Sequence, residues 1–187
     1  VDIETPIPRL TYKEAMDRYG SDKPDTRYGM ELYDLSDIVK DCGFGVFSGP
    51  VAEGGSVCGI TAKNAVAKLT RKEIDKLTEM VRGSGAKGLA WVRLNEDGTM
   101  ASSFAKFMTE DEMKAILERA DAQAGDVVLI IGDVKNSIVY SVLGALRQEV
   151  AKKLDIIPQD KYNLLWITEF PFFDWDEDSQ TWVAMHH

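Results

Sequence analysis

The sequence predicts an α+β fold, in which an antiparallel sheet carries two helices on one face in the order strand, strand, helix, strand, strand, helix (ββαββα). Short apolar runs of strand length alternate with helical patterns between residues 44 and 123. Short turns join the strands within each pair, which indicates hairpins rather than parallel crossovers. The helices begin at Thr-x-x-Glu capping boxes. These features predict a complete small domain in the middle of the chain.

Composition excludes several classes of protein. A net charge of -9 argues against free-standing, non-specific nucleic-acid binding, although it leaves room for a local basic patch. Cys42 and Cys58 form no CxxC motif, so we expect reduced cysteines of a cytosolic protein rather than a disulfide. No apolar run approaches the roughly 18 residues of a membrane span, and residues 1–10 lack a signal-peptide pattern. The absence of an initiator Met suggests a cut from a longer protein.

The first 31 residues predict a flank outside this domain. Prolines in residues 1–10 favour an extended connector. Thr11 and Glu14 form a capping box that opens a helix, which Gly20 ends. A proline-broken, charged loop follows. Its charged residues are Asp22, Lys23, Asp25 and Arg27. They indicate either a salt-bridge cluster or a clamp for a polar substrate or another domain, and both interpretations stay open.

The middle region, residues 32–124, contains the predicted domain. Its expected strands are residues 44–47, 57–61, 89–94 and 102–107, and its expected helices are a brief one at 35–40 and two longer ones that open at Thr70 and Thr109. Gly49, Gly54 and Gly55 predict a hairpin loop, since GxxxxGK spacing is absent and a strand follows. The glycines of residues 83–88 predict a turn. A phosphate contact by Arg82 and Lys87 is the less favoured alternative.

Residues 125–187 predict a second flank that belongs with residues 1–31 in another domain. Residues 127–131 form a continuous apolar strand, as expected when both faces are buried, and a helix with a wide apolar stripe follows at 137–154. Residues 164–170 and 181–185 then predict strands joined by an acidic turn. The acidic residues of this turn are Asp174, Asp176, Glu177 and Asp178. The turn lacks the glycine and the distal glutamate of an EF-hand, so we expect a solvated turn rather than a calcium site.

His186 and His187 are the only histidines of the chain, and three interpretations of them stay open. They could belong to a purification tag, bind a metal, or contact a substrate at the mouth of a site. Metal binding is disfavoured, because adjacent side chains on a strand point to opposite faces and no third ligand lies nearby in the sequence. The sequence therefore predicts no metal site.

Seven segments, spread in order over the whole chain, resemble bacterial-type aspartyl-tRNA synthetases of class II. They are residues 8–16 (PRLTYKEAM), 19–27 (YGSDKPDTR), 86–90 (AKGLA), 125–126 (GD), 143–147 (LGALR), 165–171 (LWITEFP) and 184–187 (AMHH). The middle region resembles the inserted GAD domain of these enzymes. A GAD domain also occurs in an amidotransferase subunit that acts on glutamate charged to tRNA. The resemblance implies that incomplete pieces of a class II catalytic domain flank the insertion.

The resemblance implies a parent enzyme that activates aspartate with Mg-ATP and transfers it to tRNA. Class II motifs 1, 2 and 3 are not in this chain, so we expect the isolated fragment to be inactive, to contain no catalytic residue and to bind no cofactor. By match to the family's histidine loop, His186 would contact aspartate and His187 would support the loop. An imidazole can donate a hydrogen bond to a carboxylate, more strongly when protonated.

The expected partners are tRNA and the remainder of the catalytic domain, within a cytoplasmic parent that is a homodimer, whereas the fragment itself is expected to be a monomer. Two alternatives remain. The GAD-like domain could be a non-catalytic tRNA-binding or spacer module, or the chain could be part of a tRNA-dependent amidotransferase. The sequence does not predict whether the parent charges tRNA-Asp alone or also tRNA-Asn.

Overall fold

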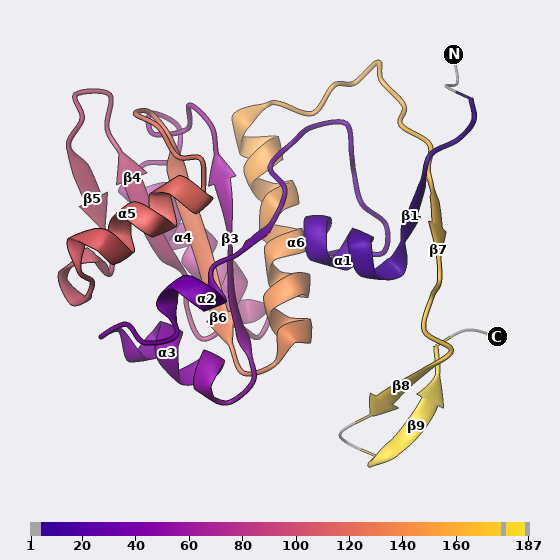
Figure 1. Cartoon of the computed structure of the whole chain (residues 1–187). Helices are drawn as coiled ribbons and strands as arrows, with labels where there is room; N and C mark the ends of the chain where they lie inside the picture. The colour runs from indigo at the N-terminus through magenta and orange to yellow at the C-terminus, as the bar shows by residue number, and fades with distance from the viewer. Residues whose placement is uncertain (1–4, 177–178, 186–187) are drawn as a thin grey trace.

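A five-stranded antiparallel sheet lies at the centre of the chain, in a computed structural model that describes residues 5–176 and 179–185 (Figure 1). Every neighbouring pair of its strands is antiparallel, as predicted. In spatial order the strands are β2 (Tyr33–Asp34), β3 (Ser56–Ala62), β6 (Val127–Asp133), β4 (Ala90–Leu94) and β5 (Met100–Ser102).

The central strand, β6, comes from the part of the chain that the sequence assigned to the second flank. It pairs along its whole length with β3 and also with β4, so the sheet cannot be completed without it. All of its residues except Gly132 are buried, which confirms the prediction that both faces of this strand are covered. The sequence pattern identified the strand correctly but could not reveal its non-local pairing.

Helices cover both faces of the sheet, which corrects the prediction that only one face is covered. α4 (Arg71–Gly83) and α6 (Asn136–Leu154) share one apolar core with Leu129 and Ile131 of β6. On the other face, α2 (Ser36–Val39), α3 (Gly45–Ala52) and α5 (Glu110–Arg119) share a second core with Val128 and Ile130. Because successive strand residues point to opposite faces, β6 contributes alternately to the two cores.

Two predicted strands are wrong: one is helical, and the other is mostly a 3-10 turn. Residues 44–47 belong to α3 and its N-cap, and Gly49 lies inside this helix rather than in a hairpin loop. Phe47 is fully buried and its ring contacts those of Phe44 and Phe104, so tertiary packing outweighs the strand-like local pattern. Residues 102–107 form only the end of β5 and a 3-10 turn, because Ser102 Oγ accepts the N–H groups of Phe104 and Ala105 and diverts the backbone from the sheet.

Two of the three predicted capping boxes form completely. Thr11 at α1 (Tyr12–Tyr19) and Thr109 at α5 both form complete boxes with the glutamate three residues on. At α4, Thr70 accepts the Glu73 N–H, but the Glu73 carboxylate pairs with Lys76 and with Lys153 of α6. Glu73 therefore joins two helices instead of closing the box.

The flanking segments form two small sheets beside the five-stranded one (Figure 1). β1 (Arg9–Thr11) pairs in parallel with β7 (Trp166–Thr168). β8 (Phe173–Asp176) and β9 (Thr181–Ala184) form an antiparallel hairpin. This corrects the predicted pairing, because the first strand of the hairpin comes from the segment predicted as an acidic turn. Hereafter β1, β7, β8 and β9 are called the arm, and residues 32–154 are called the body.

The cysteines lie in separate cores on opposite faces of the sheet, so the expectation that they do not form a disulfide is confirmed. Burial raises the pKa of the Cys58 thiol to about 12, which keeps it protonated. Of the helices in residues 5–176 and 179–185, none has both the length and the apolar character that a membrane crossing needs.

Candidate functional site

The predicted aspartate contacts, His186 and His187, lie outside the described residues, as do Glu177 and Asp178 of the acidic turn. The structure does describe the strand that leads to the histidine pair. β9 ends at Ala184, and Met185 N–H donates to the Phe172 carbonyl oxygen at 3.1 Å. The last strand of the described chain therefore ends two residues before the histidine pair.

The arm is connected to the body through close backbone contact between α1 and α6, which lie side by side in Figure 1. Gly20 ends α1 with φ +65°, a conformation that glycine adopts without strain. A Cβ atom at Gly144 would lie 2.3 Å from the Gly20 carbonyl oxygen. Two glycines are thus required at this crossing. The contact of α1 and residues 20–31 with α6 is called the joint.

Arg147 is the centre of the joint. Its side chain is 1% exposed, and it donates to the carbonyl oxygens of Tyr28 at 2.9 Å, Gly29 at 2.8 Å and Met30 at 3.0 Å. The guanidinium carbon lies 4.1 Å from the ring centre of Tyr28 and 4.9 Å from that of Tyr19. Burial lowers the pKa of Arg147, but an arginine remains charged. The arrangement holds a loop without regular secondary structure against α6.

The charged loop forms an internal ion pair at the joint. The Arg27 side chain donates two hydrogen bonds to the Asp25 carboxylate, of 2.9 and 2.8 Å, and Arg27 Nη1 also donates to the Pro158 carbonyl oxygen at 3.0 Å. The hydrogen bonds from Arg27 lower the pKa of Asp25. Asp22 and Lys23 form only an exposed pair at 3.2 Å. Of the two interpretations left open, the geometry of Asp25 and Arg27 matches a salt-bridge cluster that holds the loop.

A cavity of about 280 Å³ lies beside the joint, between the end of α1 and the segment before β7. Arg18, Tyr19, Thr26 and Tyr162 contribute to its walls. Arg18 is engaged with Glu31 at 2.7 Å, and this hydrogen bond lowers the pKa of Glu31. The cavity thus has polar and aromatic walls and two cations, Arg18, which is already paired with Glu31, and Lys161.

The arm exposes an unusual amount of aromatic surface. Trp175 and Trp182 face each other across the β8–β9 hairpin with ring centres 5.5 Å apart, yet Trp182 is 64% exposed. Large exposed apolar side chains gather in strands β7, β8 and β9 and in the residues next to them: Leu164, Trp166, Phe172, Phe173, Trp175, Trp182, Val183 and Met185. A concentration of exposed large apolar side chains of this kind is typical of an interface. The described residues leave it uncovered.

The described part of the chain contains no group of three His, Cys, Asp or Glu side chains placed to hold a metal ion. Arg82 and Lys87, the less favoured phosphate contacts, do line one cavity of about 490 Å³, together with Phe44 and Val46. Arg82 is paired with Glu79 at 3.0 Å, so the pocket is not a strongly cationic one.

Sequence reasoning missed Arg147. The available signal was an arginine on the apolar stripe of a long helix, between Leu143 and Val150, where a charged side chain requires buried acceptors. Its acceptors lie more than 100 residues earlier in the chain and are backbone atoms, so no side-chain pattern could identify them.

Comparison with known proteins yields one family and a set of long matches. The GAD domain model matches residues 47–143, slightly more than half of the chain, and the match includes β6 and the first part of α6. An aspartate–tRNA ligase of Ruminiclostridium cellulolyticum is 55% identical over all 187 residues, and one of Agathobacter rectalis is 54% identical. An aspartate–tRNA(Asp/Asn) ligase of Lachnoclostridium phytofermentans is 51% identical over the same length. The chain spans 31% of the length of each of these relatives.

Proposed function

The chain belongs to the GAD domain family, and on that premise we propose that it is the internal part of an aspartate–tRNA ligase that carries the inserted domain together with pieces of the catalytic domain. One observation carries the proposal. The identity of 55% extends over all 187 residues, so it includes the arm and the joint as well as the residues that the family model matches. A relationship confined to the inserted domain would not extend so far.

The exposed aromatic surface supports the same assignment for the arm. In the proposed parent, the remainder of the catalytic domain packs against β7, β8 and β9 and removes their aromatic side chains from water. Burial of a full aromatic side chain contributes about 2 kcal/mol, so several together suffice for stable packing. Residues 1–31 and the segment after α6 thus belong to the catalytic part, and the body is the insertion.

The reaction proposed for the parent is activation of aspartate by Mg-ATP, followed by transfer to tRNA. The residues that would bind ATP and Mg lie outside this chain, which is therefore inactive alone. His186 contacts the bound aspartate by donating a hydrogen bond to it, and His187 supports the loop. The parent is a cytoplasmic homodimer and the isolated chain is a monomer.

Two features bear on the alternatives to this assignment, the first on the role of the body and the second on the kind of parent enzyme. The 16 Lys and Arg side chains of residues 32–154 are offset by 17 Asp and Glu side chains, which favours a spacer over a tRNA-binding module, because phosphate contacts require clustered cations. Titration of residues 1–187 with tRNA-Asp at low salt distinguishes the two, and we expect no saturable binding. The names of the three relatives favour the ligase over the amidotransferase alternative.

Aspartate-dependent ATP–pyrophosphate exchange tests the proposed activity. We expect none from the chain alone and robust exchange from the full-length polypeptide that contains it. In that polypeptide, His186→Ala should raise KM for aspartate about tenfold, the effect of losing one hydrogen bond to a charged group, and leave KM for ATP unchanged. Glu79→Ala, on the exposed face of α4, is the matched control. Exchange by the chain alone would contradict the assignment of ATP binding to other segments.

A further inference from the structure

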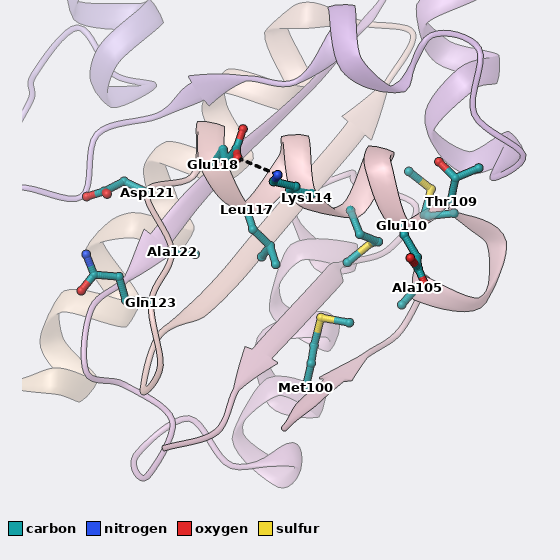
Figure 2. Close-up of a pocket in the computed structure, with 12 residues that line it drawn as sticks. Met100, Ala105, Thr109, Glu110, Lys114, Leu117, Glu118, Asp121, Ala122 and Gln123 are labelled. Carbon is teal, nitrogen blue, oxygen red and sulfur yellow. Dashed lines mark ion pairs between the residues drawn. The ribbon is translucent and has the colours of Figure 1, made fainter. Parts of the chain in front are cut away.

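An open groove of about 730 Å³ lies between α5 and the edge strand β5, far from the arm and the joint in the sequence (Figure 2). Apolar side chains make up its floor: Met100, Ala105, Met108, Met113, Leu117 and Ala122. Three of the seven methionines of the chain thus line one groove. Methionine is flexible and polarisable, and it is common on surfaces that adapt to a binding partner.

The groove is at the surface because β5 is the last strand of the sheet. Met100 is 43% exposed, and Phe107, in the turn after β5, is 45% exposed. β5 has only three residues, so an added strand would find few backbone groups to pair with. Side chains inserted from a helix would instead use the apolar floor.

The rim of the groove is acidic. Glu110, Glu118 and Asp121 line it. The single lining cation, Lys114, lies 3.9 Å from Glu118 (Figure 2), and Lys63, outside the lining, lies 3.3 Å from Asp121, so the three carboxylates still outnumber the two cations. Negative charge at the rim excludes nucleic acid as the occupant. It also opposes a second copy of this chain, which itself has a net charge of -9. Charge complementarity requires an occupant with cations beside its apolar face.

We propose that this groove binds a basic amphipathic helix of another polypeptide. Apolar side chains at positions i, i+3, i+4 and i+7 of that helix insert between the methionines, and Lys or Arg side chains on its flanks face Glu110, Glu118 and Asp121. The proposal goes beyond the function proposed above, because none of the groove's lining residues belongs to the arm or the joint.

The probe is a fluorescein-labelled helical peptide with leucine at i, i+3, i+4 and i+7 and lysine at the flanking positions. We expect saturable binding to residues 1–187 in fluorescence anisotropy, weakened at least tenfold by Leu117→Asp. Because this variant adds negative charge, non-specific attraction of a basic peptide would strengthen rather than weaken. Met100→Glu, at an exposed position, is a second variant that spares the core.

Charge is tested by reversal. Glu110→Lys combined with Glu118→Lys should weaken binding about tenfold, whereas Glu79→Lys, on the exposed face of α4 and outside the groove, should not. A peptide with glutamate in place of lysine should fail to bind. The proposal is overturned if the lysine peptide does not bind the unchanged chain at low salt. It is also overturned if the peptide binds Leu117→Asp and Met100→Glu as tightly as it binds the unchanged chain. Self-association in sedimentation, abolished by Met100→Glu, would assign the groove to a second copy instead.

Discussion

The body and the arm use similar apolar strands, but only the body buries them. All seven residues of β3 are buried, whereas all four residues of β9 are exposed. The difference lies in what covers the strands. Helices pack on both faces of the five-stranded sheet, whereas α1 contacts the β1–β7 pair and most residues of the β8–β9 pair are exposed. A two-stranded sheet is marginal in water without such cover.

The comparison teaches that stability and interaction are separated along the chain. The body contains two cores of its own and meets the condition for independent folding. The arm depends on the joint, where Arg147 and the Gly20–Gly144 crossing connect it to α6. Substitutions in the body, the joint and the arm should therefore differ in size, and the following predictions test that order.

The largest effect is expected in the body. Ile130→Ala removes a 1% exposed side chain from the central strand and should lower the free energy of unfolding by about 4 kcal/mol. Trp182→Ala, in the arm, should change it by less than about 0.5 kcal/mol, because the larger side chain is already 64% exposed. Urea unfolding followed by far-UV circular dichroism measures both. Equal losses would mean that the arm is part of the cooperative core.

The joint comes second. Arg147→Ala leaves three carbonyl oxygens without their donor and should lower the free energy of unfolding by about 3 kcal/mol. Arg82→Ala, at an exposed pair on α4, is the control and should cost less than about 0.5 kcal/mol. Hydrogen exchange adds a regional test: amides of α1 should lose protection in the variant before those of β6. Unchanged protection of α1 would show that the joint does not connect the arm to the body.

Local periodicity predicted most of the body correctly. The capped helices and the strands at β3, β4 and β6 follow from side-chain spacing, because each depends on contacts made by one face of a short segment. Residues 44–47 were predicted wrongly because the buried ring of Phe47 is held by Phe104, which lies far away in the sequence. The central place of β6 is likewise set by partners more than 30 residues distant.

The candidate site was predictable only where a family resemblance reached it. His186 and His187 came from the resemblance, and they stay predictions because they lie outside the described residues. Arg147 lies within the matching segment LGALR, yet its role depends on backbone carbonyls that carry no sequence signal. The exposed aromatic residues of the arm could not be distinguished from core residues by composition, since exposure depends on what packs over them.

Matched capping boxes give a third, smaller test of the two regions. Thr109→Ala removes the N-cap of α5 in the body, and Thr11→Ala removes that of α1 in the flank. Each loses a side-chain acceptor worth about 1 kcal/mol to its helix. Because α5 is part of a core, we expect Thr109→Ala to lower global stability, measured by urea unfolding. Thr11→Ala should mainly increase amide exchange in α1. A global loss of the same size in both would contradict the separation of the regions.

The smallest effect is a pH dependence at the joint. Arg27 holds the pKa of Asp25 below its ordinary value, and Arg18 does the same for Glu31. A carboxyl with a lowered folded-state pKa contributes stability above its unfolded pKa, and this contribution is lost as the pH falls through the folded value. We therefore expect the joint to loosen below about pH 4, by no more than about 1 kcal/mol for such partly exposed pairs.

In the body, hydrogen bonds from Lys76 and Lys153 lower the pKa of Glu73 from 4.5 to about 2, so the stability that this carboxylate contributes between α4 and α6 is lost progressively as the pH falls across that range. Asp25→Asn should remove part of the pH dependence of α1 exchange and leave that of the α4 amides intact, whereas Glu73→Gln should do the reverse. Hydrogen exchange at pH 5 and pH 3 measures both variants. If Asp25→Asn altered α4 and α1 alike, the acid response would belong to the whole chain, and the joint would not be a separable element of it.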